Sequence, residues 1–248
     1  MSDTSGTTNK AERQRVERII AGLRALYPDA RCSLDFQTPF QLLVATILAA
    51  QCTDERVNMV TPQLFAAYPT PQAFADAGLA ELEQALKQIN FYRNKAKNIQ
   101  AMAAILVSRY HGEVPKTMRE LVALPGAARK TANVVLGNAF GLVEGVIVDT
   151  HCNRISSRLG FTTSDDPVRV EQELMKLLPK ADWLDYTHLL IYHGRAICQA
   201  RKPLCQQCTL LDLCPTGAAT VAAAAAAPAP ATKSKGKAKA AKATTASN

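Results

Sequence analysis

Four of the seven cysteines fall within a stretch of 17 residues near the C-terminal end of the chain. Cys198, Cys205, Cys208 and Cys214 are spaced C-x6-C-x2-C-x5-C, and thiolates so close in sequence can surround one compact inorganic centre. Zinc ribbons usually join two separate C-x2-C pairs across a longer insert, and only one such pair is present here. The spacing therefore predicts a [4Fe-4S] cluster held by these four cysteines. Zinc and four unrelated buried thiols are the alternative interpretations.

The loop between the first two of these cysteines carries two cations, Arg201 and Lys202, followed by Pro203. A short loop that closes on a rigid cluster directs such side chains outward. We expect them to contact DNA phosphates. Two solvated surface charges are the alternative.

A second motif is the segment Leu124-Pro-Gly-Ala-Ala-Arg-Lys-Thr-Ala132. A short helix predicted from about Met118 to Ala123 runs into the turn Pro125–Gly126, and an amphipathic helix follows. Such a turn directs free backbone N–H groups outward at the N-terminus of the second helix. The segment is therefore a predicted phosphate site that reads no base information.

Lys130 falls in the first turn of that second helix, at the edge of its apolar stripe. The helix dipole and partial desolvation both disfavour the ammonium, which leaves more of the neutral, nucleophilic amine. Asp149 follows the apolar run Val146–Val148 and precedes another helix. A carboxylate near Lys130 could steady the ammonium, take a proton and stabilise positive charge on a sugar. The alternatives are a solvated surface lysine and an aspartate that only caps its helix.

Apolar residues recur with helical spacing along most of the chain, which predicts helices that each bury one face. Four such stripes are Val16, Ile19, Ile20, Leu23 and Leu26; Ile99, Met102, Ala103, Leu106 and Tyr110; Ala132, Val135, Leu136, Ala139 and Phe140; and Val170, Leu174, Leu177 and Leu178. Thr38–Pro39, Thr53 and Pro71 are predicted to begin helices. Only Val143 to Val148 could form a strand, so we expect about ten helices, no sheet and an all-α fold.

The formal net charge is +8, and five lysines without any acid lie in the last 33 residues, which leaves +3 for the rest. This basic segment, residues 216–248, is rich in Ala, Lys, Thr and Pro and is predicted to be disordered. A basic arm of this kind binds polyanions. No signal peptide and no membrane span is visible. We therefore expect a cytoplasmic, nucleoid-associated monomer with no membrane partner.

These motifs together resemble the endonuclease III family of helix-hairpin-helix DNA glycosylases. The resemblance covers about residues 15–214. It rests on the Leu124–Asn133 segment, on Val148-Asp-Thr-His151, on Ala50-Gln-Cys-Thr-Asp54 and on the cysteine quartet that follows His193-Gly-Arg195.

The resemblance implies two all-α lobes with duplex DNA lying across the cleft between them. Residues 1–34 would supply an N-terminal segment whose helix packs with the cluster domain. Residues 35–141 would form a six-helix domain with the helix-hairpin-helix, residues 142–215 the [4Fe-4S] cluster domain, and residues 216–248 the disordered tail.

The same resemblance implies a bifunctional DNA glycosylase and AP lyase of base excision repair, acting on damaged bases or abasic sites. Lys130 would attack C1′ of an oxidised pyrimidine nucleotide flipped out of the stack, form a Schiff base and cut the strand by β-elimination. Asp149 would assist, and Gln51 would fill the gap left by the flipped base. DNA contacts are expected from Gln51, Phe91, Gly126, Ala128, Arg129, Thr131, His151, Arg201 and Lys202.

Two positions depart from the family pattern. The hairpin usually reads Gly-x-Gly, and here Ala128 replaces the second glycine; a positive φ there would cost about 1 kcal/mol. The segment that usually reads Ile-Gly-Leu-Tyr is Ile89-Asn-Phe-Tyr92, so Phe91 could act as a bulkier wedge between bases. The alternative is an ordinary core phenylalanine.

Two other functions are compatible with parts of this pattern. An adenine-type mismatch glycosylase shares the fold and the cluster but usually lacks a lysine at the position of Lys130. A non-enzymatic DNA-binding or redox module would use only the hairpin and the cluster. Neither needs Lys130 together with Asp149, and that pair favours the lyase.

Overall fold

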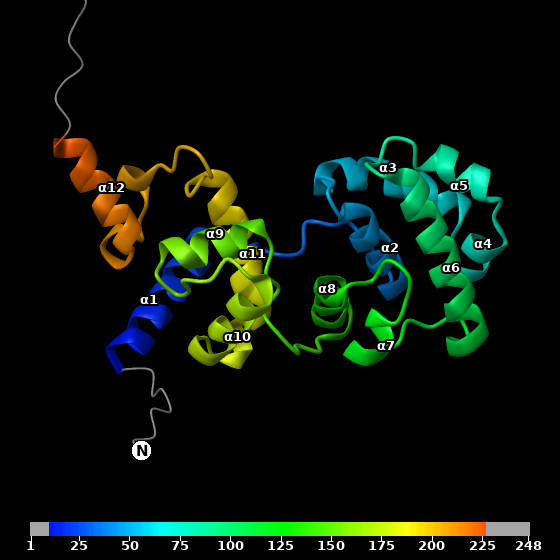
Figure 1. Ribbon diagram of the computed structural model, residues 1–248, viewed down its shortest axis with the longest axis horizontal. Coiled ribbons are helices and arrows are strands. Elements are labelled where there is room, and N and C mark those ends of the chain that lie inside the picture. Colours follow the sequence, from blue (N-terminus) through cyan, green and yellow to red (C-terminus); the bar gives the residue numbers. More distant parts are fainter. Residues whose placement is uncertain (1–9, 227–248) are drawn as a thin grey trace, which may run out of the picture.

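The computed structural model describes residues 10–226, and this part of the chain is helical with no strand (Figure 1). It forms two lobes. The lobe that includes the N-terminal helix contains α1 (Lys10–Leu26), α9 (Thr150–Arg158), α10 (Pro167–Leu177), α11 (Trp183–Ala196) and α12 (Pro215–Ala226), with 3₁₀ turns at Lys180–Asp182, Cys205–Gln207 and Leu211–Leu213. The other lobe contains α2 (Pro39–Ala49), α3 (Asp54–Ala67), α4 (Pro71–Asp76), α5 (Leu79–Ala85), α6 (Tyr92–Tyr110), α7 (Met118–Val122) and α8 (Arg129–Phe140).

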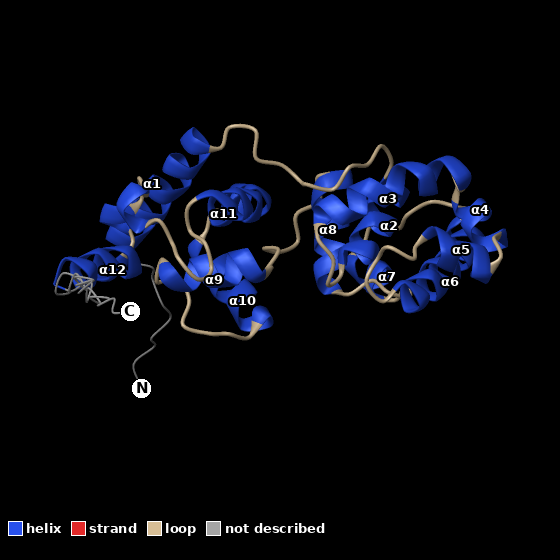
Figure 2. Cartoon of the chain, turned by 90° about the horizontal axis from the view of Figure 1, so that it is seen from above, coloured by secondary structure: helices blue, strands red, loops and turns tan. Residues whose placement is uncertain are grey.

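Each lobe has its own hydrophobic core. One core joins buried residues between positions 34 and 136, and the other joins residues 16–23 to residues 146–210. Helix α1 packs against α11, although the two helices are far apart in sequence (Figure 1). Two extended connections, residues 27–38 and 141–149, run between the lobes (Figure 2). The predicted all-α, two-lobed fold is therefore confirmed.

The helices begin where the sequence places side-chain caps. The hydroxyls of Thr38, Thr53, Thr70 and Thr117 each accept a hydrogen bond from a backbone N–H in the first turn of the helix that follows. Such caps satisfy N–H groups that have no partner within the helix. Local chemistry therefore fixes the starts of α2, α3, α4 and α7.

The segment Val143–Val148 is an extended connection without a strand partner in the described chain, in agreement with the prediction that it builds no sheet. Two details differ from the sequence predictions. Residues 35–141 contain seven helices rather than six, because Ala77 and Gly78 separate the short helices α4 and α5. The prediction of disorder from residue 216 onward is wrong for residues 216–226, which form most of α12.

Helix α12 is ordered because it packs on the rest of the lobe. It contacts both 3₁₀ turns of the cysteine segment and α9. At Gly217 the fit is close, since an added Cβ would lie 3.2 Å from Leu211 Cδ1 and 3.4 Å from Cys214 Sγ. Alanine has the highest helix propensity, so this packing suffices to hold the helix. The five tail lysines lie in residues 227–248, outside the described residues.

Candidate active site

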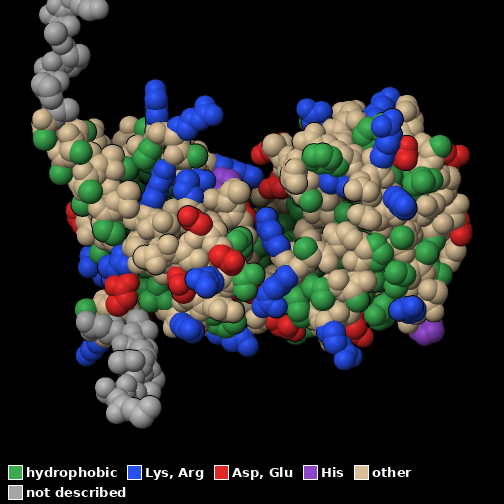
Figure 3. Space-filling model, in the orientation of Figure 1, with side chains coloured by type: hydrophobic (Ala, Val, Ile, Leu, Met, Phe, Trp, Pro, Cys, Tyr) green, Lys and Arg blue, Asp and Glu red, His purple; other side chains and the backbone are tan. Residues whose placement is uncertain are grey.

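A cleft of about 520 Å³ lies between the two lobes. Its lining comes from both of them and includes Gln51, Lys130 and Thr131 on one side and Asp149, His151 and Arg195 on the other. The space-filling view shows this hollow, with Lys and Arg side chains along its rim (Figure 3). Ligand sites typically occupy about 300–1,000 Å³, so the cleft has room for one flipped nucleotide.

The hairpin between α7 and α8 takes the predicted form. Gly126 adopts a left-handed conformation (φ 81°), and an added Cβ would lie 3.2 Å from Ile47 Cγ2 and from Asn98 Cβ. Ala128, the N-cap of α8, is extended (φ −86°, ψ 171°), so the expected penalty for replacing a glycine there does not arise. Its side chain cannot cap, which leaves the first N–H groups of α8 without a side-chain partner.

Lys130 occupies the second position of α8 and its side chain is exposed, whereas Ala132, Val135 and Leu136 are buried. The amphipathic pattern of α8 thus points the amine into the cleft while the opposite face packs in the core. The predicted place of Lys130 at the edge of the buried stripe agrees with this arrangement.

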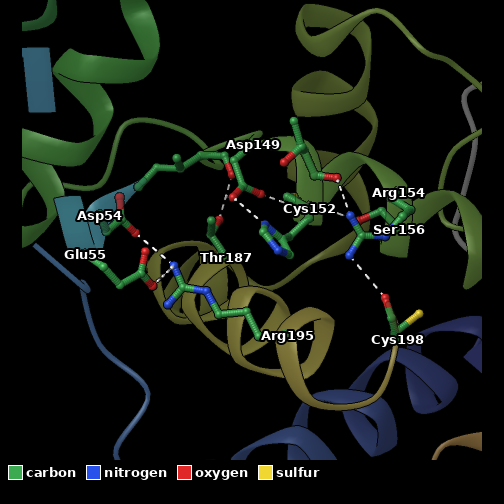
Figure 4. Close-up of polar contacts among 12 residues, drawn as sticks. Asp54, Glu55, Asp149, Cys152, Arg154, Ser156, Thr187, Arg195 and Cys198 are labelled. Carbon is green, nitrogen blue, oxygen red and sulfur yellow. Dashed lines mark hydrogen bonds and ion pairs between the residues drawn. The ribbon is translucent and has the colours of Figure 1, made fainter. Parts of the chain in front are cut away.

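Asp149 does two things. It caps α9, because Oδ1 accepts a 2.6 Å hydrogen bond from the Cys152 backbone N–H, and Oδ2 lies 3.3 Å from His151 Nδ1 (Figure 4). Burial alone would raise the pKa of this carboxyl. The hydrogen bonds from His151 and Cys152 and the positive charge of Lys130 outweigh burial and hold its pKa below the ordinary value. The carboxylate is therefore ionised at neutral pH and lies within electrostatic reach of the amine.

Arg129 forms a bridge between the lobes. Its Nε and Nη2 donate hydrogen bonds of 2.9 and 3.0 Å to the two carboxylate oxygens of Glu171 on α10, and Asn133 Nδ2 donates a third of 3.1 Å. Glu171 is buried and packs so closely on Gly145 that a Cβ there would overlap its carboxylate. The Arg129 guanidinium thus binds Glu171, whereas the sequence predicted that it would contact DNA.

A second bridge crosses the cleft itself. Arg195 Nη2 on α11 lies 3.0 Å from Asp54 Oδ2 and 3.8 Å from Glu55 Oε1 on α3 (Figure 4). His188 Nε2 lies 2.9 Å from Asn138 Oδ1, a third polar contact between the lobes. No local sequence signal predicts these pairs. Nothing in a single sequence links residues about 50 to 140 positions apart.

The remaining predicted DNA contacts lie on the surface or in the cleft. Gln51, Thr131 and His151 line the cleft. Phe91 is 65% exposed, so its interpretation as a core residue is wrong. Arg201 and Lys202 are exposed at the far end of the cysteine loop, as predicted.

Cys198, Cys205, Cys208 and Cys214 line a single, largely apolar cavity. None of them forms a disulfide. Within residues 10–226 no three His, Cys, Asp or Glu side chains form a group placed to hold one metal ion.

Donors are directed at the sulfur atoms of this cavity. Arg158 Nη1 lies 3.2 Å from Cys198 Sγ, and the Gly217 backbone N–H donates to Cys214 Sγ at 3.3 Å. Hydrogen bonds of this kind stabilise negative charge on thiolate ligands. Four thiols, an apolar wall and N–H donors to the sulfurs fit an iron–sulfur cluster.

An exposed amine beside an ionised carboxylate, at the wall of a nucleotide-sized cleft and next to a hairpin with free N–H groups, suits covalent attack on a sugar in DNA. The fold and the site thus define a helix-hairpin-helix DNA glycosylase. The family model described as "HhH-GPD superfamily base excision DNA repair protein" matches residues 44–180. The chain belongs to the endonuclease III family within this superfamily.

Two curated relatives and a solved structure support this assignment. Endonuclease III of Synechocystis is 56% identical over 210 residues, which span 85% of this chain and 96% of the relative. Endonuclease III of Escherichia coli K12 is 42% identical over 206 residues, or 83% of this chain and 96% of the relative. A trapped endonuclease III–DNA covalent intermediate superposes with a TM-score of 0.79 at 46% identity, covering 84% of this chain and 98% of the other.

Family membership makes the chain a DNA glycosylase and AP lyase of base excision repair, with damaged duplex DNA as its partner. Neither the adenine-type mismatch glycosylase nor the non-enzymatic module is favoured. None of the helices within residues 10–226 is long and apolar enough to cross a membrane.

Proposed function

We propose that Lys130 is the nucleophile with which this enzyme removes oxidised pyrimidines from duplex DNA. Its neutral Nζ attacks C1′ of the flipped nucleotide, and the N-glycosidic bond breaks as the base leaves with the bonding electrons and takes up a proton. Opening of the sugar ring gives a Schiff base between Nζ and C1′. Loss of a C2′ proton then expels the 3′ phosphate, and water hydrolyses the imine to release Lys130.

The observation that carries this proposal is that Lys130 and Asp149 line the same cleft although they come from different lobes. The low pKa of Asp149 supports an electrostatic role more than proton abstraction, because a weak base gains little from taking the proton of an ammonium. An ionised Asp149 stabilises the positive charge that develops on the sugar as the base departs.

The other predicted residues would bind the DNA around this centre. The hairpin from Gly126 through Ala128 to Thr131 would bind a phosphate with backbone N–H groups. Gln51 and Phe91 would enter the gap left by the flipped nucleotide, and His151 would hold Asp149 in place. Arg201 and Lys202 would contact phosphates further along the duplex. Arg129 would reach DNA only if it released Glu171.

We further propose that the four-cysteine cavity holds a [4Fe-4S] cluster with a structural role, remote from the chemistry. Cys198, Cys205, Cys208 and Cys214 would be the ligands, with Arg158 and the Gly217 N–H donating to their sulfurs. We expect purified protein to contain about four iron and four sulfide per chain and no stoichiometric zinc, as measured by elemental analysis. Replacing Cys208 by Ser should lower both iron and sulfide. One zinc and no sulfide per chain would contradict the assignment.

The enzyme is expected to act as a monomer on nucleoid DNA in the cytoplasm. The test of its chemistry is borohydride trapping on duplex DNA that contains thymine glycol. Reduction should convert the Schiff base into a stable protein–DNA adduct, and peptide mass analysis should place the attached sugar on Lys130. A protein that cuts this DNA but gives no adduct, or an adduct on another residue, would contradict the proposal.

A further inference from the structure

Two of the three non-glycine residues in left-handed conformation within residues 10–226 are Gln51 (φ 55°) and Phe91 (φ 57°). The third, His111, ends α6 and precedes a glycine, as is common at helix ends. Gln51 and Phe91 belong to different turns, one after α2 and one before α6. Left-handed backbone costs free energy for these residue types and persists only where the surroundings enforce it.

The two turns are tied directly to each other. Asn90 Nδ2 donates a 2.7 Å hydrogen bond to the backbone carbonyl of Gln51. Because Asn90 immediately precedes Phe91, this contact connects the backbone of Gln51 to the residue next to Phe91.

Lys95 lies one turn into α6 and forms hydrogen bonds to both of these segments from the side that faces the core. Its Nζ donates hydrogen bonds of 2.8 Å to Leu48 O and 2.6 Å to Ala50 O, at the C-terminal end of α2. Its backbone N–H donates a 3.2 Å hydrogen bond to Phe91 O. One residue therefore contacts both the segment that precedes Gln51 and Phe91 itself.

The side chain of Lys95 is unusual because it is only 6% exposed, and none of the ion pairs found within residues 10–226 includes it. Burial lowers the pKa of this ammonium, so its charge opposes folding. The negative end of the α2 dipole and the two carbonyls offset part of that cost. A buried cation without a carboxylate partner is weak evidence for a purely stabilising role.

We propose that Lys95 and Asn90 are positioning residues that join the Gln51 turn and the Phe91 turn into one rigid wedge. This inference rests on the proposed function, in which both turns enter the DNA at the flipped nucleotide. Unstacking a base requires free energy. A flexible turn would deform instead of holding the neighbouring bases apart, and the nucleotide would return to the stack. A pre-formed wedge avoids this loss because its backbone is already fixed before binding. Phe91, two-thirds exposed, is its apolar tip.

The test compares Lys95→Met and Asn90→Ala with two controls on the same segment, Lys97→Met and Asn94→Ala. Lys97 and Asn94 are exposed, so these controls remove a cation or an amide of the same type without touching either turn. Each variant is assayed on a paired thymine-glycol duplex and on the same duplex with a preformed abasic site. The fluorescence of 2-aminopurine beside the lesion reports unstacking.

Base excision should fall by at least about tenfold in Lys95→Met and about threefold in Asn90→Ala, because flipping a paired base needs the wedge. Cutting at the abasic site should fall by no more than about threefold, since no base has to be unstacked. The 2-aminopurine signal should fall in both variants, and the controls should match the intact protein. Should Lys95→Met not fold, Asn90→Ala, whose changed side chain is exposed, decides the question.

Equal losses on the two substrates would overturn the proposal, because they would indicate damage to the fold or to the chemistry. Undiminished base excision in both variants would overturn it too. These outcomes are separate from the test of the proposed function, which fails if the intact protein cuts thymine-glycol DNA without giving a borohydride adduct or gives an adduct on a residue other than Lys130.

Discussion

Replacing Lys130 by Ala is expected to abolish both base excision and strand cutting, with single-turnover rates lower by about 10⁴-fold or more. In the proposed mechanism the glycosylase and the lyase steps both pass through the bond between Nζ and C1′, so the loss of this amine should stop both. DNA binding should change little. The side chain is exposed at the cleft wall and is proposed to contact the sugar rather than a phosphate, so the salt dependence of binding should also stay nearly the same.

Three measurements on Lys130→Ala check this expectation: the single-turnover rate, the borohydride adduct and the dissociation constant for duplex DNA as a function of salt. Lys87→Ala is a matched control, since Lys87 is an exposed lysine on the same lobe but outside the cleft lining. An adduct of normal yield in Lys130→Ala would assign the nucleophile to another amine. Lost DNA binding would instead indicate that Lys130 serves mainly as a phosphate contact.

The elements that carry these residues could be predicted because their signals are local. The stripes at residues 99–106 and 132–136 are buried as expected, and Thr38 and Thr53 cap the helices that they were predicted to begin. The same holds for Asp149, whose capping role follows from its place before α9. In each case the deciding interaction lies within about four residues, so the sequence alone contains it.

Features that depend on distant partners could not be predicted. Arg129 was expected to bind DNA, but its guanidinium forms hydrogen bonds with Glu171, which lies 42 residues further along the chain. Composition predicted disorder for residues 216–226, and packing against the cysteine segment makes them helical. Phe91 illustrates a third case, because an apolar residue in a short motif is compatible with core or surface until the backbone around it is known.

Asp149→Asn is expected to retain DNA binding and to lose most turnover. Asparagine is close to isosteric with aspartate and caps helices about as well, so the bond to the Cys152 N–H and the start of α9 should survive. The negative charge beside Lys130 is lost, and with it the stabilisation of positive charge on the sugar. We expect kcat to fall by about 10²- to 10³-fold, with the dissociation constant for DNA changed by less than about threefold.

Stability as a function of pH tests the ionisation of Asp149 independently of activity. Because the pKa of Asp149 in the folded protein is below the ordinary value of 3.8, ionised Asp149 stabilises the fold at neutral pH. This contribution is fully present above the unfolded-state pKa and is lost as the pH falls through the lower, folded-state pKa. The difference in free energy of unfolding between the intact protein and Asp149→Asn, measured with urea, should therefore be constant from pH 6 to 8 and should shrink below about pH 4.

Asp166→Asn separates capping from charge, because Asp166 caps α10 through the Val168 and Arg169 N–H groups and lies outside the cleft lining. If capping were the whole role of Asp149, both variants would keep full turnover. If Asp149 instead ordered the DNA-binding surface, turnover and DNA affinity would fall together in Asp149→Asn. Only a carboxylate that acts on the reacting sugar predicts that turnover is lost while affinity is kept, and that Asp166→Asn leaves both unchanged.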